Sequence, residues 1–286
     1  MKWQGRRGSS NIEDRRRRPT RRRGAAPKLG GMGLIIVLVA GYFLGIDVSP
    51  LLNNQAAGGI ATNGSSEITA ADERMAEFVS VTLADTEDVW TDIFNRQVGE
   101  PYDPPTLVLF KGTTQSACGG ASAATGPFYC PPEEKAFLDT DFFVTMERQL
   151  GASGDFAAAY VVAHEIAHHV QNELGILPQV NRLRAQSDQE TSNALSVRVE
   201  LQADCFSGIW ARAVQQKFGS LERGDIAEAL NAAAQIGDDT LARNAGRAVR
   251  PHTFTHGSSA QRQRWFQRGF ESGDVTVCDT FSTNQL

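Results

Sequence analysis

The chain has 286 residues, of which 41% are hydrophobic, and its 28 Lys and Arg against 33 Asp and Glu give a formal net charge of −5. The charge is unevenly distributed, because residues 1–28 hold 11 of the basic residues but only two acidic ones, which leaves −14 for residues 29–286. A basic segment alone would suit a nucleic-acid-binding protein, but the acidic remainder argues against that class, and no nucleic-acid partner is expected.

An apolar run follows the basic segment. Residues 29 to 46 are 18 consecutive residues without a charge, about the minimum for a helix that crosses a bilayer. Basic residues before such a run favour a cytoplasmic N-terminus. The sequence therefore predicts a single-pass membrane protein, with a cytoplasmic arm (1–28), a transmembrane helix in the lipid bilayer (29–47) and an extracytoplasmic remainder. A cleaved signal peptide is the alternative, but the run is long for one and no convincing small-residue cleavage site precedes Gln55.

The remainder is predicted to consist of a linker and one domain. Residues 48–66 are rich in Gly, Ala, Asn and Ser and predict a flexible tether. Residues 67–286 suffice for a single domain with a full core, predicted to be α+β and mostly helical with a small sheet. Helical periodicity spans 68–97, and strands are predicted at 106–110, 128–130 and 135–139. Helices resume from 141 and include 156–174, 191–216, 222–237 and 259–272.

The helix predicted at 156–174 carries an H-E-x-x-H motif formed by His164, Glu165 and His168. Residues four apart share one face of a helix, so both imidazoles can bind one metal ion. Glu165 lies beside that face, where it suits a general base acting on a water at the metal. A surface helix with His and Glu by chance is the alternative, but the flanks are too apolar for it. His169 points elsewhere and is predicted to pack or to form hydrogen bonds.

Catalytic zinc sites have three protein ligands and one open position. Glu200, the first residue of an E-x-x-x-D pattern in the 191–216 helix, is predicted to be the third ligand for one Zn²⁺ ion. Asp204, one turn later, is predicted to accept the second N–H of His164 and to fix the orientation of the ring. The acidic residues that could compete with Glu200 are Glu173, Asp188 and Glu190.

A second polar cluster lies near residue 256. Peptide hydrolysis passes through a tetrahedral oxyanion, and a donor beyond the metal helps to stabilise it. His256, at a predicted loop-to-helix junction, is the candidate for this catalytic role. Arg262 is predicted to bind either the substrate or an acidic residue of the site. The alternative is that Ser258 or Ser259 caps a helix whose Arg residues form a solvated face.

The four Cys residues are consistent with an extracytoplasmic domain, where disulfides persist. No two of them lie within four residues of each other, which argues against Cys metal ligands. Four Cys allow three connectivities. The favoured one joins Cys118 to Cys130 across a loop rich in Gly, Ala and Ser, and Cys205, on the helix of Glu200, to Cys278 near the C-terminus.

These motifs resemble those of the bacterial neutral zinc metallopeptidase family of membrane-anchored proteins, over nearly the whole chain. The resembling stretches are 1–7, 13–16, 164–171, 200–205, 254–257, 264–266 and 278–281. The resemblance implies a gluzincin-like fold and a zinc-dependent peptidase activity. The spacing of His256 and Arg262 is also similar to a pattern in other membrane gluzincins.

The function predicted from the sequence is that of a membrane-anchored zinc endopeptidase acting on a peptide or protein substrate. Glu165 would assist the attack of water on the peptide bond at a metal held by His164, His168 and Glu200. The alternative is a membrane-anchored binding or scaffold protein whose metal site is structural or degenerate. A fourth protein ligand in place of the open position would favour that alternative.

Overall fold

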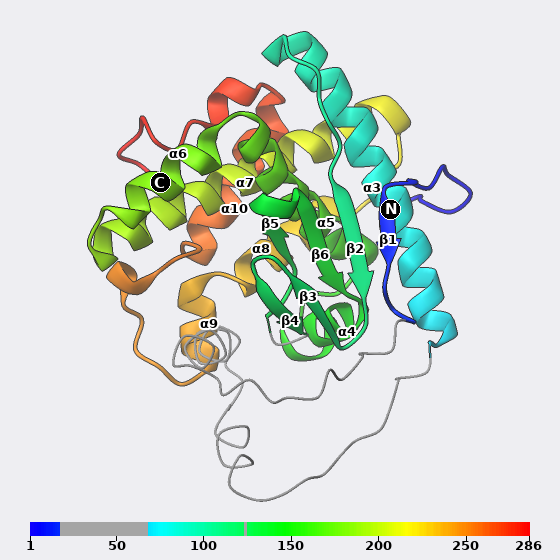
Figure 1. Ribbon diagram of the computed structural model, residues 1–286, viewed down its shortest axis with the longest axis horizontal. Coiled ribbons are helices and arrows are strands. Elements are labelled where there is room, and N and C mark those ends of the chain that lie inside the picture. Colours follow the sequence, from blue (N-terminus) through cyan, green and yellow to red (C-terminus); the bar gives the residue numbers. More distant parts are fainter. Residues whose placement is uncertain (18–67, 123–124) are drawn as a thin grey trace, which may run out of the picture.

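The structure, a computed structural model, describes residues 1–17, 68–122 and 125–286 (Figure 1). It is a mostly helical α+β arrangement with a small sheet, as predicted. The helices are α3 (Ala70–Ile93), α4 (Thr140–Gln149), α5 (Asp155–Glu173), α6 (Ile176–Ala185), α7 (Gln189–Phe218), α8 (Asp225–Gln235), α9 (Asp238–Asn244) and α10 (Ser259–Ser272). The strands are β1 (Ile12–Asp14), β2 (Thr106–Phe110), β3 (Thr113–Ser116), β4 (Gly119–Ser122), β5 (Phe128–Cys130) and β6 (Lys135–Asp139).

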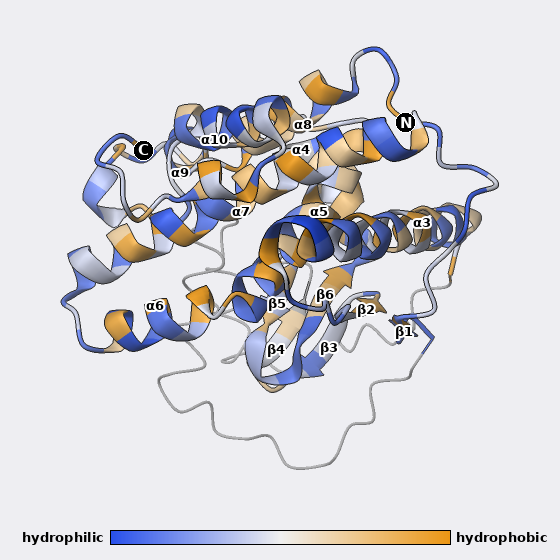
Figure 2. Ribbon diagram, turned by 90° about the horizontal axis from the view of Figure 1, so that it is seen from above, coloured by the Kyte–Doolittle hydropathy of each residue, from blue (hydrophilic) through white to orange (hydrophobic). Residues whose placement is uncertain are grey.

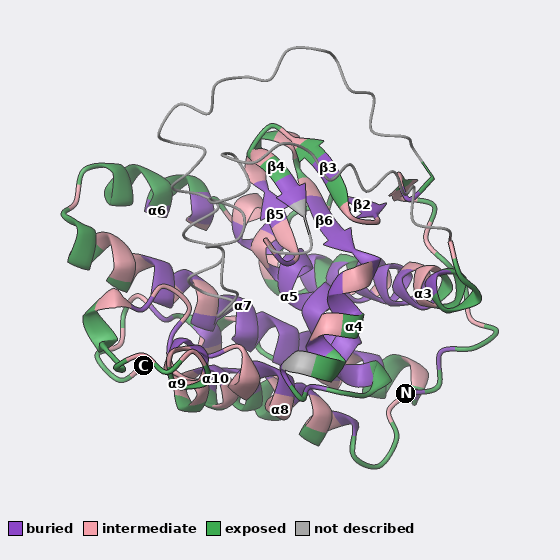
Figure 3. Ribbon diagram, turned by 90° about the horizontal axis from the view of Figure 1, so that it is seen from below, coloured by how far each residue is buried: buried purple, intermediate pink, exposed green. Residues whose placement is uncertain are grey.

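Helix α5 forms the centre of the core. It packs against α3, α7 and α8, and it also contacts β5 and β6. Its ribbon is buried over most of its length, whereas that of α6 is largely exposed (Figure 3). Ala and Val occupy eight of its 19 positions and let its neighbours approach closely. The Phe156 ring stacks on Trp210 of α7 with the ring centres 5.8 Å apart. The helix that carries the H-E-x-x-H motif is therefore held on several sides.

The main sheet has the strand order β1-β2-β6-β5. Strands β1, β2 and β6 are parallel, and β5 runs antiparallel to β6. Strands β3 and β4 form a separate antiparallel hairpin. The predicted strands at 106–110, 128–130 and 135–139 are confirmed as β2, β5 and β6, while β1 and the hairpin were not predicted.

The first 17 residues differ from the predicted basic arm, because they pack on the folded body instead of standing apart from it. Strand β1 pairs with β2, with Ile12 opposite Leu107. The Arg6 guanidinium donates two hydrogen bonds, of 2.6 and 2.7 Å, to the carboxylate of Asp85 on α3. Helix α3 is amphipathic, and hydrophobic and hydrophilic residues alternate along its ribbon (Figure 2). The separation predicted between residues 1–28 and residues 67–286 is thus wrong for residues 1–17.

The predicted transmembrane helix at 29–47 and linker at 48–66 lie outside the residues that the structure describes. Within the described ranges, none of the helices combines the length and the apolar character that crossing a membrane requires.

Both predicted disulfides are confirmed. Cys118, in the turn between β3 and β4, is bonded to Cys130 of β5, and Cys205 on α7 is bonded to Cys278. Gln202, one turn before Cys205, donates a hydrogen bond of 3.0 Å to the Cys278 carbonyl oxygen. The C-terminal segment is thereby fixed to the helix that carries Glu200.

Helices α7 and α10 approach each other through two glycines. A Cβ atom on Gly208 would collide with the carbonyl oxygen of Phe266, and one on Gly269 would collide with that of Cys205. No other residue fits at such a backbone contact. This close packing brings Arg262 on α10 next to Asp204 on α7.

We predict that Asp72 makes the stability of the fold depend on pH. Burial raises the pKa of this carboxyl, but the hydrogen bonds from Lys111 and Thr69 outweigh burial and lower the pKa from 3.8 to about 2. A lowered folded-state pKa contributes stability above pH 4, which is lost as the pH falls towards 2, and the shift corresponds to about 2 kcal/mol. The Asp72→Asn variant should therefore unfold about 2 kcal/mol more easily at pH 7 in urea titrations, and this difference should shrink to near zero at pH 2.

The matched control for this prediction is Asp92→Asn. Asp92 lies on the same helix and forms an ion pair with Lys217. Its side chain is 43% exposed. Exposed pairs of this kind contribute less than about 1 kcal/mol. A stability difference for Asp72→Asn that stays the same from pH 7 to pH 2 would contradict the assignment.

Candidate metal centre

Helix α5 presents His164, Glu165 and His168 to one cavity. Gly154, with a φ of 107°, precedes the helix, and the Ala-rich turns that follow favour helix formation up to the motif. The two imidazole rings lie edge to face, with their centres 4.8 Å apart. His164 and Glu165 are both less than a tenth exposed. Buried polar side chains of this kind need partners.

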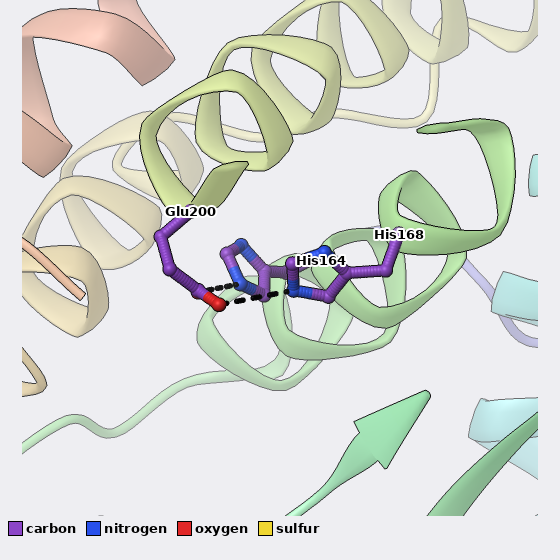
Figure 4. A group of neighbouring side chains, drawn as sticks. All are labelled: His164, His168 and Glu200. Atoms are coloured by element: carbon purple, nitrogen blue, oxygen red, sulfur yellow. Dashed lines mark hydrogen bonds and ion pairs between the residues drawn. The ribbon is translucent and has the colours of Figure 1, made fainter. Parts of the chain in front are cut away.

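Glu200 on α7 faces both imidazoles (Figure 4). Its Oε2 atom lies 3.1 Å from Nε2 of His164, and its Oε1 atom lies 3.6 Å from Nε2 of His168. One ligand atom of each of these residues lies within 4.8 Å of the other two. The structure therefore brings together the three side chains that the sequence predicted as zinc ligands.

Each imidazole is held through its other nitrogen. His164 Nδ1 lies 3.0 Å from Oδ1 of Asp204, as predicted. His168 Nδ1 lies 2.8 Å from Oε1 of Gln171, a partner that was not predicted. An acceptor at Nδ1 keeps the proton there and leaves the Nε2 lone pair directed at the metal position. In both histidines it is therefore the Nε2 atom that would be available to a metal ion.

Gln171 is itself fixed by α7. Its Nε2 atom donates to the carbonyl oxygen of Val199 at 2.8 Å and to Oε1 of Gln202 at 3.0 Å. This amide is fully buried. It orients the His168 ring and connects α5 to α7, the helix that carries Glu200.

Asp204 is the centre of a buried network. Its carboxylate accepts hydrogen bonds of 2.8 and 3.0 Å from the Arg262 guanidinium and another from the Tyr160 hydroxyl. Arg262 and Asp204 are at most 2% exposed. Of the two roles predicted for Arg262, the structure shows the contact with an acidic residue of the site.

These contacts shift the pKa values of the side chains at the site in the protein without a bound metal ion. Burial lowers the pKa of His164, but Asp204 and Glu200 outweigh burial and raise it to about 9. Burial raises the pKa of Glu200, but His168 and His256 bring it well below its usual value. The pKa of Glu165 is raised, chiefly by burial. The Glu200 carboxylate is thus stabilised in its charged form by the surrounding histidines, and burial gives Glu165 an environment that favours accepting a proton.

His256 lines the same cavity from the loop before α10. This loop is anchored by Oδ2 of Asp238, which accepts the backbone N–H groups of Thr255, His256 and Gly257 at 2.7 to 3.0 Å. The His256 Nδ1 atom lies 3.5 Å from the other carboxylate oxygen of Asp238. The structure thus places the His256 side chain at the cavity.

His169 supports Tyr129, which lines the cavity. The Tyr129 hydroxyl lies 2.9 Å from its Nδ1 atom, and its Nε2 atom lies 2.7 Å from the carbonyl oxygen of Asp103. Burial lowers its pKa, and the ring forms hydrogen bonds as predicted. Tyr129 belongs to β5, and this contact fixes the strand against α5.

The cavity beside the candidate ligands has a volume of about 670 Å³. Its walls are partly apolar, and residues from several elements contribute, among them Phe128, Phe142, Val161, Leu177 and Val199. Glu165 and the three candidate ligands form its polar floor. This arrangement suits a ligand that combines apolar side chains with a polar centre.

Comparison with known proteins places the site in a family. The profile of the family described as "Putative neutral zinc metallopeptidase" matches residues 1–281. The chain is 45% identical to "Uncharacterized protein YpfJ" of Escherichia coli (strain K12), over 98% of this chain and 99% of that protein. It is 46% identical to "Uncharacterized protein Rv2575" of Mycobacterium tuberculosis (strain ATCC 25618 / H37Rv), over 65% of each chain. No solved structure matches.

Proposed function

Because the chain belongs to the "Putative neutral zinc metallopeptidase" family, we propose that it is a zinc-dependent endopeptidase. The observation that carries this proposal is the convergence of His164, His168 and Glu200 beside Glu165 at the floor of a cavity. Two imidazoles and one carboxylate are a ligand set typical of catalytic zinc. Among the described residues, three side chains form this group. A zinc ion held by three protein ligands would keep a fourth coordination position for water or substrate.

The ligand residues fit zinc because their second contacts are already in place. The Nδ1 atoms of both histidines are bound to Asp204 and Gln171, so the Nε2 atoms remain for the metal. A zinc ion bound there would polarise the scissile carbonyl and make an attacking water more acidic. Glu165 would accept the proton of that water and transfer it to the leaving amine. His256 would donate to the developing oxyanion.

We propose that the substrate is an extended peptide. Strand β5 lies at the edge of the main sheet, paired only with β6 among the described strands, and Phe128 and Tyr129 of β5 line the cavity. An edge strand offers backbone partners to an added peptide strand. The apolar walls would receive apolar side chains next to the bond that is cut.

We also propose that the folded body works in an oxidising compartment outside the bacterial cytoplasm. The two disulfides support this location, because such bonds are rare in reducing compartments.

The test of the proposal joins metal analysis to a cleavage screen on the full chain. The purified protein should contain one zinc ion per chain and cut members of a random peptide library, and a chelator should stop the cleavage. The His168→Ala variant should lose both zinc and cleavage, whereas His252→Ala, which alters an exposed histidine, should keep both. A full zinc content in His168→Ala would refute the ligand assignment. Zinc bound as predicted, but with no chelator-sensitive cleavage of any peptide, would instead favour the binding or scaffold alternative.

A further inference from the structure

The N-terminal segment, residues 1–17, is built into the folded body at several points. Strand β1 forms the outer parallel strand beside β2. The Leu107 N–H donates to the Asn11 carbonyl oxygen at 2.8 Å, and the Arg15 N–H donates to the Leu109 carbonyl oxygen at 2.7 Å. Backbone pairing of this kind requires the two strands to be direct neighbours, about 5 Å apart.

Side chains of the N-terminal segment are buried in the body. Trp3 is 9% exposed, and its ring meets Phe78 of α3 edge to face. Its Nε1 atom donates at 2.9 Å to Asp155, the first residue of α5. The N-terminal segment therefore contacts the helix that carries the H-E-x-x-H motif, at the N-terminal end of that helix.

The positive charges of the segment are matched by acidic residues of α3. Arg6 binds Asp85 through two hydrogen bonds, and its guanidinium also lies 4.1 Å from the ring centre of Phe218. Arg16, whose side chain is 4% exposed, lies 2.9 Å from the Glu73 carboxylate. A basic arm destined for a lipid surface or a nucleic acid would keep such charges free, whereas here they are used within the body.

The end of the segment lies beside the start of α3. Arg16 donates at 2.9 Å to the carbonyl oxygen of Asp72, and Arg17 forms an ion pair with Glu73. Asp72 and Glu73 are in the first turn of α3. The two chain ends that flank residues 18–67 are thus neighbours on one side of the body.

We propose that residues 1–17 and residues 68–286 form one inseparable folding unit, and that both therefore lie on the same side of the membrane. A single crossing at 29–47 would put a hydrocarbon layer about 30 Å thick between Arg16 and Glu73, whose side chains are in contact. The predicted single-pass arrangement, with a cytoplasmic N-terminus and an extracytoplasmic body, is incompatible with this packing.

The experiment cross-links the segment to the body in intact cells. Ser9 and Ser80 are joined by a backbone hydrogen bond of 3.0 Å, so the Ser9→Cys/Ser80→Cys double variant of the full chain places two thiols side by side. A short, membrane-permeant bis-maleimide should join them, and peptide mass spectrometry should find the linked pair. The matched control is Ser9→Cys/Asn95→Cys, because Asn95 is exposed and lies about 20 Å further along the same helical stretch, beyond the reach of the reagent.

Each result distinguishes the two arrangements. Linkage of residues 9 and 80 in intact cells, without linkage in the control, supports a common side. Linkage that appears only after detergent has dissolved the membrane would overturn the proposal, because it would show that a bilayer separates the two segments. Linkage in neither case would overturn the packing itself.

A second measurement guards against a double variant that folds poorly. Arg6→Asp and Asp85→Arg should each lower the amount of protease-resistant full chain in cells several-fold. The Arg6→Asp/Asp85→Arg combination should restore it, because the exchanged charges can pair again. Single variants without effect, or a combination without rescue, would show that the pair does not form in cells.

Discussion

Replacing Glu165 by Gln is expected to lower peptide cleavage about 10²- to 10⁴-fold, the range that general acid–base groups contribute. The amide has nearly the same shape as the carboxylate but cannot accept the proton of an attacking water. Glu165 is not one of the three residues whose ligand atoms converge, so the zinc content should stay at one ion per chain. Zinc analysis and kcat/KM on the same peptide substrate measure the two effects separately.

The matched control is Glu190→Gln, which makes the same chemical change at an exposed position near the start of α7. It should keep both zinc and cleavage. Unchanged turnover in Glu165→Gln would rule out Glu165 as the base. Loss of zinc in this variant would show instead that Glu165 helps to hold the metal.

The proximity of the candidate ligands could be predicted from the sequence because helical spacing fixes it. His164 and His168 lie four residues apart on one helix, and Glu200 and Asp204 repeat this spacing on another. A single approach of α5 to α7 then brings all four side chains together. The buried histidines and carboxylates in apolar helices were a further signal, since such groups require partners.

Gln171 was missed because an amide side chain gives no chemical signal of its own. It lies three residues after His168 on the same helix, so it is within reach of the ring. An amide at this offset from a predicted ligand, in an otherwise apolar stretch, was the available clue. Its contacts with Val199 and Gln202 depend on the packing of α5 against α7, which the sequence alone does not reveal.

The N-terminal segment was misinterpreted because its pairing is non-local. Strand β1 has only three residues and pairs with a strand more than 90 residues later. The dense positive charge around it is typical of a free basic arm when the arm is considered alone. The compensating signal lies on α3, where four acidic residues form ion pairs with Arg residues of the segment; they are Glu73, Asp85, Glu87 and Asp88.

Pro178 shows why a helix end is hard to predict from the nearby sequence alone. A proline soon after an expected helix end usually stops continuation. In the structure, Gly175 adopts a φ of 72° and α6 starts directly after it, with Pro178 inside its first turn. Proline is tolerated there because the first N–H groups of a helix have no intrahelical partner. A proline at this distance is compatible both with a chain that leaves the helix and with a new helix that begins.

Replacing Asp204 by Asn is the second change with a large expected effect, because one carboxylate serves both the metal site and a buried charge. Loss of the acceptor at Nδ1 of His164 should weaken zinc binding about 10- to 100-fold. The Arg262 guanidinium, 2% exposed, would lose its counter-charge, and breaking a buried pair on one side costs about 3 to 5 kcal/mol. Zinc competition titrations and urea unfolding of the chelated protein measure the two losses.

The Asp204→Asn/Arg262→Met combination separates these two effects. Removing both charges should restore much of the stability, because no unpaired buried charge remains. It should not restore zinc affinity, because His164 would still lack the carboxylate that sets its tautomer. Zinc affinity equal to that of the unmodified chain in Asp204→Asn would show that Asp204 does not orient the ligand. Recovery of both properties in the combination would assign the defect to the unpaired arginine alone. The two effects need the double variant to separate them because Oδ1 of Asp204 is shared: it lies 3.0 Å from Nδ1 of His164 and also accepts a 3.0 Å hydrogen bond from Arg262, while Oδ2 accepts the 2.8 Å hydrogen bond from Arg262 Nε.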